Sequence, residues 1–336
     1  MTELEGHDGQ RTPTTAGRAG GGRVSGERAL LETRGLCRYF GGVKAAHDIS
    51  FTVRRGLITS LIGPNGAGKT TVFNSITGIF PPTAGEVVFQ HPERGAVSIG
   101  GMEANQICEL GVARTFQNIR LFPDLPVVEN VKVGLHARTK SGLLASIFRT
   151  PAMRREEAEV HAAALRYLDF VGLLPLAHDL ATNLAYGDQR RLEIARALAT
   201  HPQLLLLDEP AAGMNPMETD QLMELIRRIS TSGCTVLLIE HDMKLVMNIS
   251  DYVYVMDHGE LIAEGTPEVV RTDPRVIEAY LGVQGDADDA EHLSEDEEPL
   301  VPFEAVAAEG DDAAETSGPA EPGPATPDAD EEAPRG

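Results

Sequence analysis

Paired cysteines, long apolar runs and an apolar leader are all missing from this chain. The three cysteines, Cys37, Cys108 and Cys234, lie far apart without C-x-x-C spacing, which argues against a disulfide framework and a cysteine-based zinc site. No window reaches the ~18–20 consecutive apolar residues of a membrane-spanning helix, so we expect no span. The segment 1–28 has no apolar h-region, so we expect no secretory signal.

Negative charge is concentrated at one end of the chain. The formal net charge is −22, but residues 283–336 hold 18 Asp and Glu against one Arg, which leaves −5 for the rest. This segment is rich in Ala, Pro and Gly and cannot bury enough apolar surface to offset its ordering entropy. We therefore predict disordered tails at 1–28 and 283–336 around a folded domain at 29–282, which is long enough for a full α/β domain.

A glycine-rich stretch carries the first strong motif. It fits G-x-x-x-x-G-K-[ST], the phosphate-binding loop, between an apolar run at 57–62 that predicts a buried strand and a predicted helix at 71–77. Backbone N–H groups and the positive helix end can cradle phosphate oxygens, which glycines let the main chain approach. Lys69 would reach the β- and γ-phosphates, and Thr70 would hold Mg²⁺. The expected nucleotide contacts are Gly63, Pro64, Asn65, Gly66, Ala67, Gly68, Lys69, Thr70 and Thr71.

Two carboxylates follow a second buried strand. Residues 204–207 are four leucines, a run without alternation that suits a central parallel strand covered on both faces. Asp208 and Glu209 come next, at the carboxyl end of the strand, where α/β folds bind ligands. We expect Asp208 to hold Mg²⁺ through water and Glu209 to orient or polarise the attacking water.

Three further residues are candidates for the same site. Gln117, after a predicted strand at 112–116, can coordinate Mg²⁺ and position water, although a lone glutamine is more often a solvated surface residue. His241, after a predicted strand at 235–239, can donate to the γ-phosphate. An aromatic ring ahead of the glycine loop, Tyr39 or Phe40, can stack on adenine; we take Phe40 as the candidate, and a core aromatic is the alternative.

A second glycine turn opens a helix with an apolar stripe. Residues 184–189 run into Leu192, Ala195 and Leu198, and Gly187 with Asp188 suits a helix start. A helix N-terminus is an anion site, and a second such site in one chain would serve another molecule's nucleotide.

Helical periodicity dominates residues 120–185, in contrast to the strand–helix alternation elsewhere. We therefore expect a helical subdomain there, either as a surface for a partner or as packing alone. Its predicted helices are 127–136 and 157–174. The remaining expected strands are 30–40, 48–53, 85–89, 252–256 and 261–264, and short helices are expected at 266–271 and 274–280.

In this order the motifs resemble the ATP-binding cassette of ABC transporters. The matches, in chain order, are Walker A at 63–70, the Q-loop at Gln117, the signature at 184–189, Walker B at 204–209, the D-loop at Asn215 and the H-loop at His241. More narrowly, the chain is similar to the LivG-type ATPases of branched-chain amino-acid importers at 114–117, 184–196, 211–216, 239–247 and 265–282.

The resemblance implies an α/β fold, a P-loop NTPase of the ABC type with an antiparallel β subdomain and a helical subdomain. It implies ATP and Mg²⁺ as cofactors and two cassettes facing head to tail, with Ala185 and Gly187 of one chain meeting the ATP of the other. Implied partners are permease membrane subunits, a related second ABC ATPase or a second copy of this chain, and indirectly an extracytoplasmic solute-binding protein, with no nucleic acid. The chain would be a peripheral subunit at the cytoplasmic face of the membrane that powers branched-chain amino-acid uptake.

Two positions depart from the general cassette pattern. Ala185 stands where the signature usually has Ser, which removes a hydroxyl from the γ-phosphate, and Asn215 stands where the D-loop usually has Asp. Both fit the LivG-type pattern, and both leave open whether the two ATP sites of a dimer are equal. Other solutes, such as urea or amides, remain alternatives, as do a lipid-export ATPase and a cassette protein outside transport.

Overall fold

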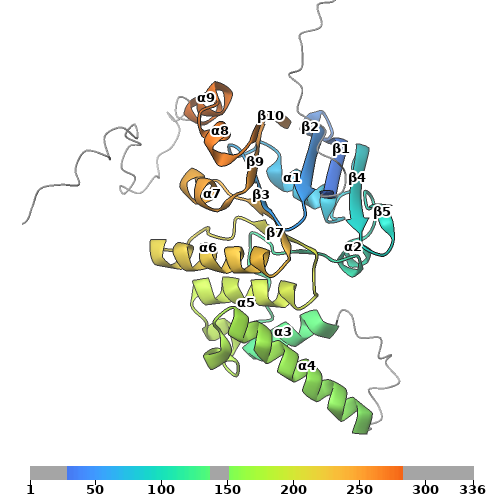
Figure 1. Ribbon diagram of the computed structural model, residues 1–336, viewed down its shortest axis with the longest axis vertical. Coiled ribbons are helices and arrows are strands. Elements are labelled where there is room, and N and C mark those ends of the chain that lie inside the picture. Colours follow the sequence, from blue (N-terminus) through green and yellow to red (C-terminus); the bar gives the residue numbers. More distant parts are fainter. Residues whose placement is uncertain (1–28, 137–150, 283–336) are drawn as a thin grey trace, which may run out of the picture. The chain divides into compact units, whose positions relative to one another are not determined.

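The computed structural model describes residues 29–136 and 151–282 of the 336-residue chain (Figure 1). The tails predicted at 1–28 and 283–336 lie outside the described residues, as does part of the expected helical subdomain, 137–150. The strands are β1 (Ala29–Phe40), β2 (Val43–Arg54), β3 (Ile58–Ile62), β4 (Ala84–His91), β5 (Gly95–Ser98), β6 (Val112–Arg114), β7 (Leu204–Asp208), β8 (Thr235–Ile239), β9 (Tyr252–Asp257) and β10 (Glu260–Gly265). The helices are α1 (Lys69–Ile76), α2 (Ala104–Glu109), α3 (Val127–His136), α4 (Pro151–Phe170), α5 (Tyr186–Leu198), α6 (Pro216–Thr231), α7 (Met243–Ile249), α8 (Pro267–Arg271) and α9 (Pro274–Gly282), with short 3-10 turns η2 (Leu174–Leu176) and η3 (Ala181–Asn183).

An antiparallel sheet joins the first strands in the order β2-β1-β4-β5. Leu31 of β1 pairs with Val53 on one side and with Phe89 on the other, and all three side chains are buried. These buried residues form one face of the sheet, as alternation predicts. The strand β5 was not predicted, because its four residues are mostly exposed and carry no apolar alternation.

The second sheet has the order β10-β9-β3-β8-β7-β6, and its strands are parallel except for β10. The leucines of β7 alternate between two cores: Leu204 and Leu206 pack on one side, and Leu205 and Leu207 on the other. The prediction of a central parallel strand covered on both faces is confirmed. The carboxyl ends of β3, β6, β7 and β8 therefore meet at one edge.

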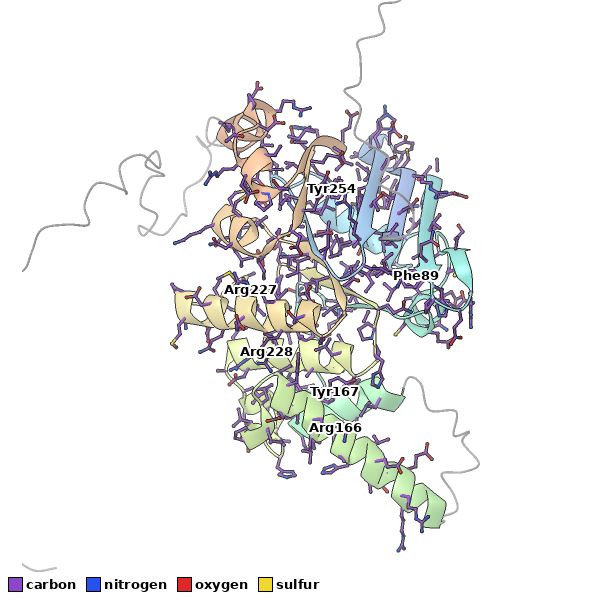
Figure 2. The ribbon with its side chains drawn as sticks, in the orientation of Figure 1. Phe89, Arg166, Tyr167, Arg227, Arg228 and Tyr254 are labelled. Atoms are coloured by element: carbon purple, nitrogen blue, oxygen red, sulfur yellow. The ribbon has the colours of Figure 1, made fainter. Side chains whose placement is uncertain are left out.

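Three apolar clusters cover this sheet. One lies between the two sheets around α1 and contains Phe89 and Tyr254, both labelled in Figure 2. A second joins the other face to α3, α4, α5 and α6, and a third joins β9 and β10 to α7, α8 and α9. Figure 1 shows α3, α4 and α5 grouped together, in line with their mutual contacts.

The helix at 127–136 is confirmed, whereas the bounds of the next helix were wrong. It begins at Pro151 instead of 157 and ends at Phe170 instead of 174, since Gly172 adopts a left-handed φ of +77° that stops the helix. The helices α2, α6 and α7 were not predicted. The start of α6 could have been predicted from the sequence, because Asn215 and Glu218 form a capping box and Pro216 stands in the first turn.

Candidate functional site

The glycine loop after β3 turns sharply into α1. Gly63, Gly66 and Gly68 have φ angles of +148°, +81° and +100°, a region that side chains rarely adopt. A Cβ at Gly63 would collide with the carbonyl oxygen of Met256, and one at Gly68 with that of Ala45. These glycines let the backbone lie close against β9 and β2, so that the amides ahead of α1 surround a concave surface.

Lys69, the first residue of α1, is 5% exposed and points back into the loop. Its ammonium donates to the carbonyl oxygens of Gly63 at 2.7 Å and Pro64 at 3.0 Å. Burial lowers the pKa of Lys69, and the carboxylates of Glu209 and Asp208 oppose that shift. The Lys69 ammonium therefore lies against the loop carbonyls and within electrostatic reach of both acids.

A cleft of about 450 Å³ lies along the loop. It brings together predicted residues from three segments: Asn65, Gly66, Gly68, Lys69, Thr70, Thr71, Gln117 and Glu209. Five lining residues were not predicted: Val43, Lys44, Ala45, His258 and Gly259. They come from β2 and from the β9–β10 turn, which long-range sheet pairing places beside the loop.

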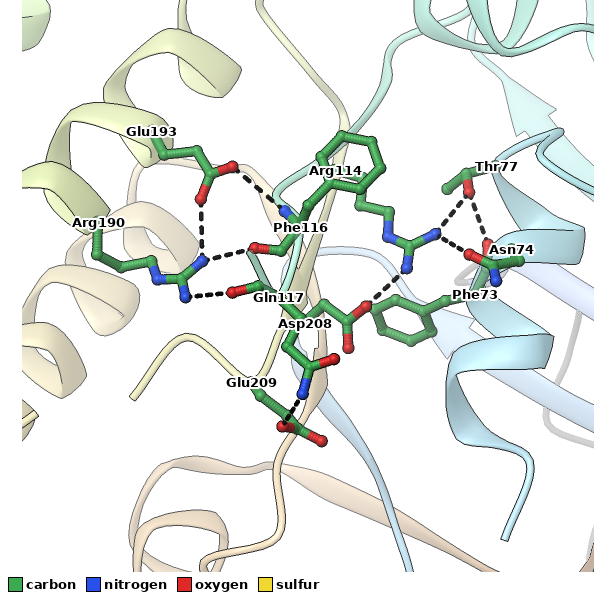
Figure 3. A network of polar contacts seen from close by, with 10 residues as sticks. All are labelled: Phe73, Asn74, Thr77, Arg114, Phe116, Gln117, Arg190, Glu193, Asp208 and Glu209. Atoms are coloured by element: carbon green, nitrogen blue, oxygen red, sulfur yellow. Dashed lines mark hydrogen bonds and ion pairs between the residues drawn. The ribbon is translucent and has the colours of Figure 1, made fainter. Parts of the chain in front are cut away.

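Asp208, at the end of β7, is held by an ion pair that the sequence did not reveal (Figure 3). Arg114 NH2 lies 2.6 Å from Asp208 Oδ2, with side-chain exposures of 6% and 2%. The other guanidinium nitrogen, Arg114 NH1, donates to Asn74 Oδ1 at 2.7 Å and Thr77 Oγ1 at 3.0 Å. The second carboxylate oxygen, Asp208 Oδ1, is buried and has no hydrogen-bond partner among the described residues.

Glu209 follows in a left-handed conformation with φ +44°, which is uncommon outside glycine. Its N–H donates to the carbonyl oxygen of Ile239 at 2.9 Å, which fixes the turn against β8. The Gln117 amide Nε2 donates to Glu209 Oε2 at 2.9 Å, so the two predicted residues meet directly (Figure 3). Strained residues are retained where their neighbours hold them, often at functional sites.

Comparison with known proteins decides the family. The model of the ABC transporter family matches residues 46–212, and one described as branched-chain amino acid ATP-binding cassette transporter matches residues 260–286. The chain is 50% identical over 254 residues to the high-affinity branched-chain amino acid transport ATP-binding protein LivG of Salmonella typhimurium, covering 75% of this chain and 98% of that protein. It is 49% identical over 256 residues to BraF of Pseudomonas aeruginosa, which carries the same description, covering 76% and 98%.

A solved structure agrees with these relatives. The ADP conformation of an ATP-binding cassette of an ABC transporter superposes with a TM-score of 0.65 at 34% identity, covering 76% of this chain and 99% of that one. The chain belongs to the ATP-binding cassette family of ABC transporters. It is accordingly a nucleotide-binding ATP hydrolase, and the family pairs such cassettes with membrane permeases. No helix within residues 29–136 and 151–282 is long and apolar enough to cross a bilayer.

In this cassette the residues after β8 lie beside those after β7. Glu240 is buried, and its carboxylate accepts from the Ala211 N–H at 2.9 Å and the His241 N–H at 3.3 Å. Burial raises the pKa of Glu240, and these amides oppose the rise. The His241 side chain is exposed and does not line the 450 Å³ cleft. Glu240 was not predicted as a site residue, although the sequence places this acid directly after an unbroken apolar strand.

The aromatic candidate of the cassette is exposed at the end of β1. The Phe40 ring, 40% exposed, meets Phe80 edge to face at 5.5 Å between centroids, and the Arg38 guanidinium lies 4.6 Å from its centre. Tyr39 instead places its hydroxyl 2.8 Å from His47 Nδ1. Phe40 is therefore partly exposed, although it does not line the cleft.

The signature of the cassette opens α5 one residue earlier than expected, at Tyr186, with Ala185 as N-cap. Ala185 and Tyr186 are exposed, whereas Gly187 is buried beside the Glu218 carboxylate of the same chain. Asp188 lies in the first helical turn and pairs with Arg191. None of these residues lines the cleft of this chain, so within one cassette the signature and the glycine loop are separate sites.

Proposed function

We propose that this chain is the ATP-binding and hydrolysing subunit of an importer of branched-chain amino acids. The observation that carries the proposal is 50% identity over nearly the whole of LivG, joined to the specific match at 260–286. That second match covers β10, α8 and α9, which follow the last shared cassette motif. Because ATP is supplied inside the cell, the chain would act as a peripheral subunit at the cytoplasmic face of the membrane.

The cleft fits a nucleoside triphosphate. The loop of residues 63–68 supplies N–H groups and the start of α1, where an anion is favoured. Lys69 would turn from the loop carbonyls toward the β- and γ-phosphates, and Thr70 and Thr71 line the same cleft. Phe40 would offer its exposed ring to adenine.

The residues at the strand ends fit a Mg²⁺ ion. Asp208 Oδ1 is a buried oxygen with no partner within the described chain, while Arg114 engages Oδ2. Carboxylate, hydroxyl and amide oxygens are the hard donors that Mg²⁺ prefers, and Thr70, Gln117 and Asp208 offer one of each. A metal bound there would neutralise charge on the phosphate oxygens during transfer.

Hydrolysis would depend on Glu209 and its neighbours. Glu209 would accept a proton from the attacking water, held in place by the Gln117 amide and by its bond to Ile239. His241, on the adjoining strand end, would donate to the γ-phosphate once a second cassette closes the site. Loss of the γ-phosphate would then weaken the closed state, which gives the differential affinity that a two-state switch needs.

The partners would meet different surfaces of the chain. A second cassette, related or identical, would present its own Ala185 and Gly187 to this ATP, with approach through the exposed Ala185 side. The permease subunits would contact the largely apolar groove of about 320 Å³ between α2, β6 and α3, which includes Ile79 and Val133. An extracytoplasmic solute-binding protein would act only indirectly.

Uptake measurements in cells test which solutes the transporter carries. Cells lacking this chain should lose uptake of labelled leucine, isoleucine and valine but keep uptake of labelled urea. The wild-type chain should restore it, whereas Glu209→Gln should not, and Lys69→Ala should abolish nucleotide binding by the purified chain. Retained leucine uptake together with lost urea uptake would reject the proposed solute class, and full activity of Glu209→Gln would reject the assigned base.

A further inference from the structure

Arg190 lies in the second turn of α5, and its side chain is fully buried. Its guanidinium faces the loop that follows β6 (Figure 3). NH1 donates to the carbonyl oxygen of Phe116 at 2.6 Å, and NH2 donates to that of Gln117 at 2.8 Å. One side chain of the signature helix therefore holds two successive carbonyl groups of the Q-loop.

Glu193, one turn further along α5, completes the attachment. Its Oε2 lies 3.0 Å from Arg190 NH1, and its Oε1 accepts from the N–H groups of Phe116 and Arg120, each at 3.4 Å. Burial raises the pKa of Glu193, and the Arg190 charge opposes that rise. A buried ion pair is seldom more stabilising than apolar packing of the same volume, so the distinctive feature of this pair is the loop backbone that it holds.

The side chain of Gln117 extends away from Arg190 toward Glu209. Arg190 grips the Gln117 carbonyl, while the Gln117 amide donates to Glu209 Oε2 at 2.9 Å. Arg190 NH2 also donates to the hydroxyl of Tyr186 at 3.2 Å, and Tyr186 is 43% exposed beside Ala185. The guanidinium thus touches both the exposed signature segment and the residue that contacts the candidate base.

We propose that Arg190 is a positioning residue that sets the place of Gln117 against Glu209 and ties it to the signature segment. The inference rests on the roles proposed above for Gln117 and Glu209. The Gln117 amide donates to the Glu209 carboxylate, whereas the loop of residues 63–68 and Lys69 form the phosphate cradle, so a shift of the Gln117 backbone alters the geometry of hydrolysis and leaves that cradle intact. Small misplacements of such groups lower rates strongly.

A double-mutant cycle on kcat tests the inference. ATP hydrolysis is measured in the assembled transporter with the full chain as wild type, Arg190→Lys, Gln117→Ala and the double variant. We expect Arg190→Lys to lower kcat by about ten- to a hundredfold with unchanged binding of a fluorescent ATP analogue, because one ammonium cannot reproduce the contacts that the planar guanidinium makes at once to the Phe116 and Gln117 carbonyls, Glu193 and Tyr186. The double variant should be no slower than Gln117→Ala alone, since Arg190 acts through Gln117. Arg227→Lys is the control: Arg227 is an exposed arginine of α6 that donates to the Asn248 carbonyl oxygen, and we expect unchanged kcat.

The other possible results show whether the inference about Arg190 fails alone or the proposed function of the site fails with it. The positioning role would be overturned if the two substitutions lowered kcat multiplicatively in the double variant. It would also be overturned if Arg190→Lys lowered nucleotide binding as much as it lowered kcat. A fall with Gln117→Ala but none with Arg190→Lys would refute the inference alone, whereas no fall with Gln117→Ala would refute the role of Gln117 and the inference with it. If Arg190→Lys does not fold, Glu193→Gln keeps the volume of the pair and should show the same non-additivity with Gln117→Ala.

Discussion

Replacing Arg114 by methionine should remove the only ion-pair partner within 4 Å that the described residues give to Asp208. Methionine keeps the apolar stem between Phe73 and Phe116, whose rings lie 5.5 and 5.2 Å from the guanidinium carbon. The substitution therefore removes the charge and its hydrogen bonds with little change in packing. It leaves a carboxylate that is 2% exposed without its ion-pair partner, and only the longer-range charge of Lys69 then opposes it.

The magnitude follows from burial and from the bonds lost. Removing one member of a buried ion pair costs about 3–5 kcal/mol because the other charge is left uncompensated. The lost bonds to Asn74 and Thr77 would each add about 1 kcal/mol if they were independent, but they share the guanidinium with the pair. We expect Arg114→Met to lower the free energy of unfolding by about 4 kcal/mol, against a total of about 5–15 for an ordinary domain.

Urea unfolding at pH 7 measures this loss, followed by circular dichroism because the chain has no tryptophan. The double variant Arg114→Met/Asp208→Asn should recover most of the stability, since neither charge of the pair then remains buried. Arg34→Met is the control: Arg34 is 57% exposed in its pair with Glu32, and its loss should cost under about 1 kcal/mol. A loss at Arg114 no larger than the control, or no recovery in the double variant, would refute the reasoning.

Three other predictions use different parts of the chain. Burial raises the pKa of Glu240 above 4.5, so the folded chain binds more protons there than the unfolded chain, and its contribution is present below pH 4.5 and lost as pH rises through the folded pKa. The stability of Glu240→Gln relative to wild type should therefore improve from pH 4.5 to pH 8 in urea unfolding, and a constant difference would contradict this. The buried Tyr280 hydroxyl has no partner of good geometry, and burial raises its pKa to about 12 against the opposing Gly63 amide. Tyr280→Phe should leave the free energy of unfolding unchanged or raise it by up to about 1 kcal/mol. A fall of about 1 kcal/mol would instead show that the Tyr280 hydroxyl makes a stabilising hydrogen bond. Deleting residues 284–336 should leave ATP hydrolysis by the assembled transporter unchanged, and a large fall would give the acidic segment a role in the site.

The elements that the sequence predicted are those whose pattern is local. Buried strands such as β7 and β8 show unbroken apolar runs, and the glycine loop has its strand and helix on either side. β5 and α2 escaped prediction because they are four and six residues long with few buried side chains. α4 was misplaced at both ends, since its exposed residues 154–159 carry no apolar period to mark a start.

The contacts that organise the site could not be predicted, because they depend on pairing between distant strands. Arg114 and Asp208 are 94 residues apart and meet only because β6 lies beside β7. Arg190 shows the same limit: it is not part of the apolar stripe of Leu192, Ala195 and Leu198 that the sequence shows, and its acceptors are backbone carbonyls 73 and 74 residues away. A sequence motif identifies residues that can take part in catalysis, whereas the topology of the sheet determines which of those residues are in contact.

The burial of Gly187 limits the routes by which a triphosphate held by a second cassette could reach the signature. The first N–H groups of α5 lack partners within the helix and favour an anion, and the Glu218 carboxylate already lies against Gly187. Glu218 also accepts from the Asn215 N–H at 3.0 Å, so the same carboxylate joins the signature to the D-loop. A triphosphate from another chain must therefore approach on the side of Ala185 and Tyr186 or displace Glu218. On the first route the triphosphate would meet Tyr186, whose hydroxyl accepts from Arg190, and on the second it would displace Glu218, which accepts from Asn215.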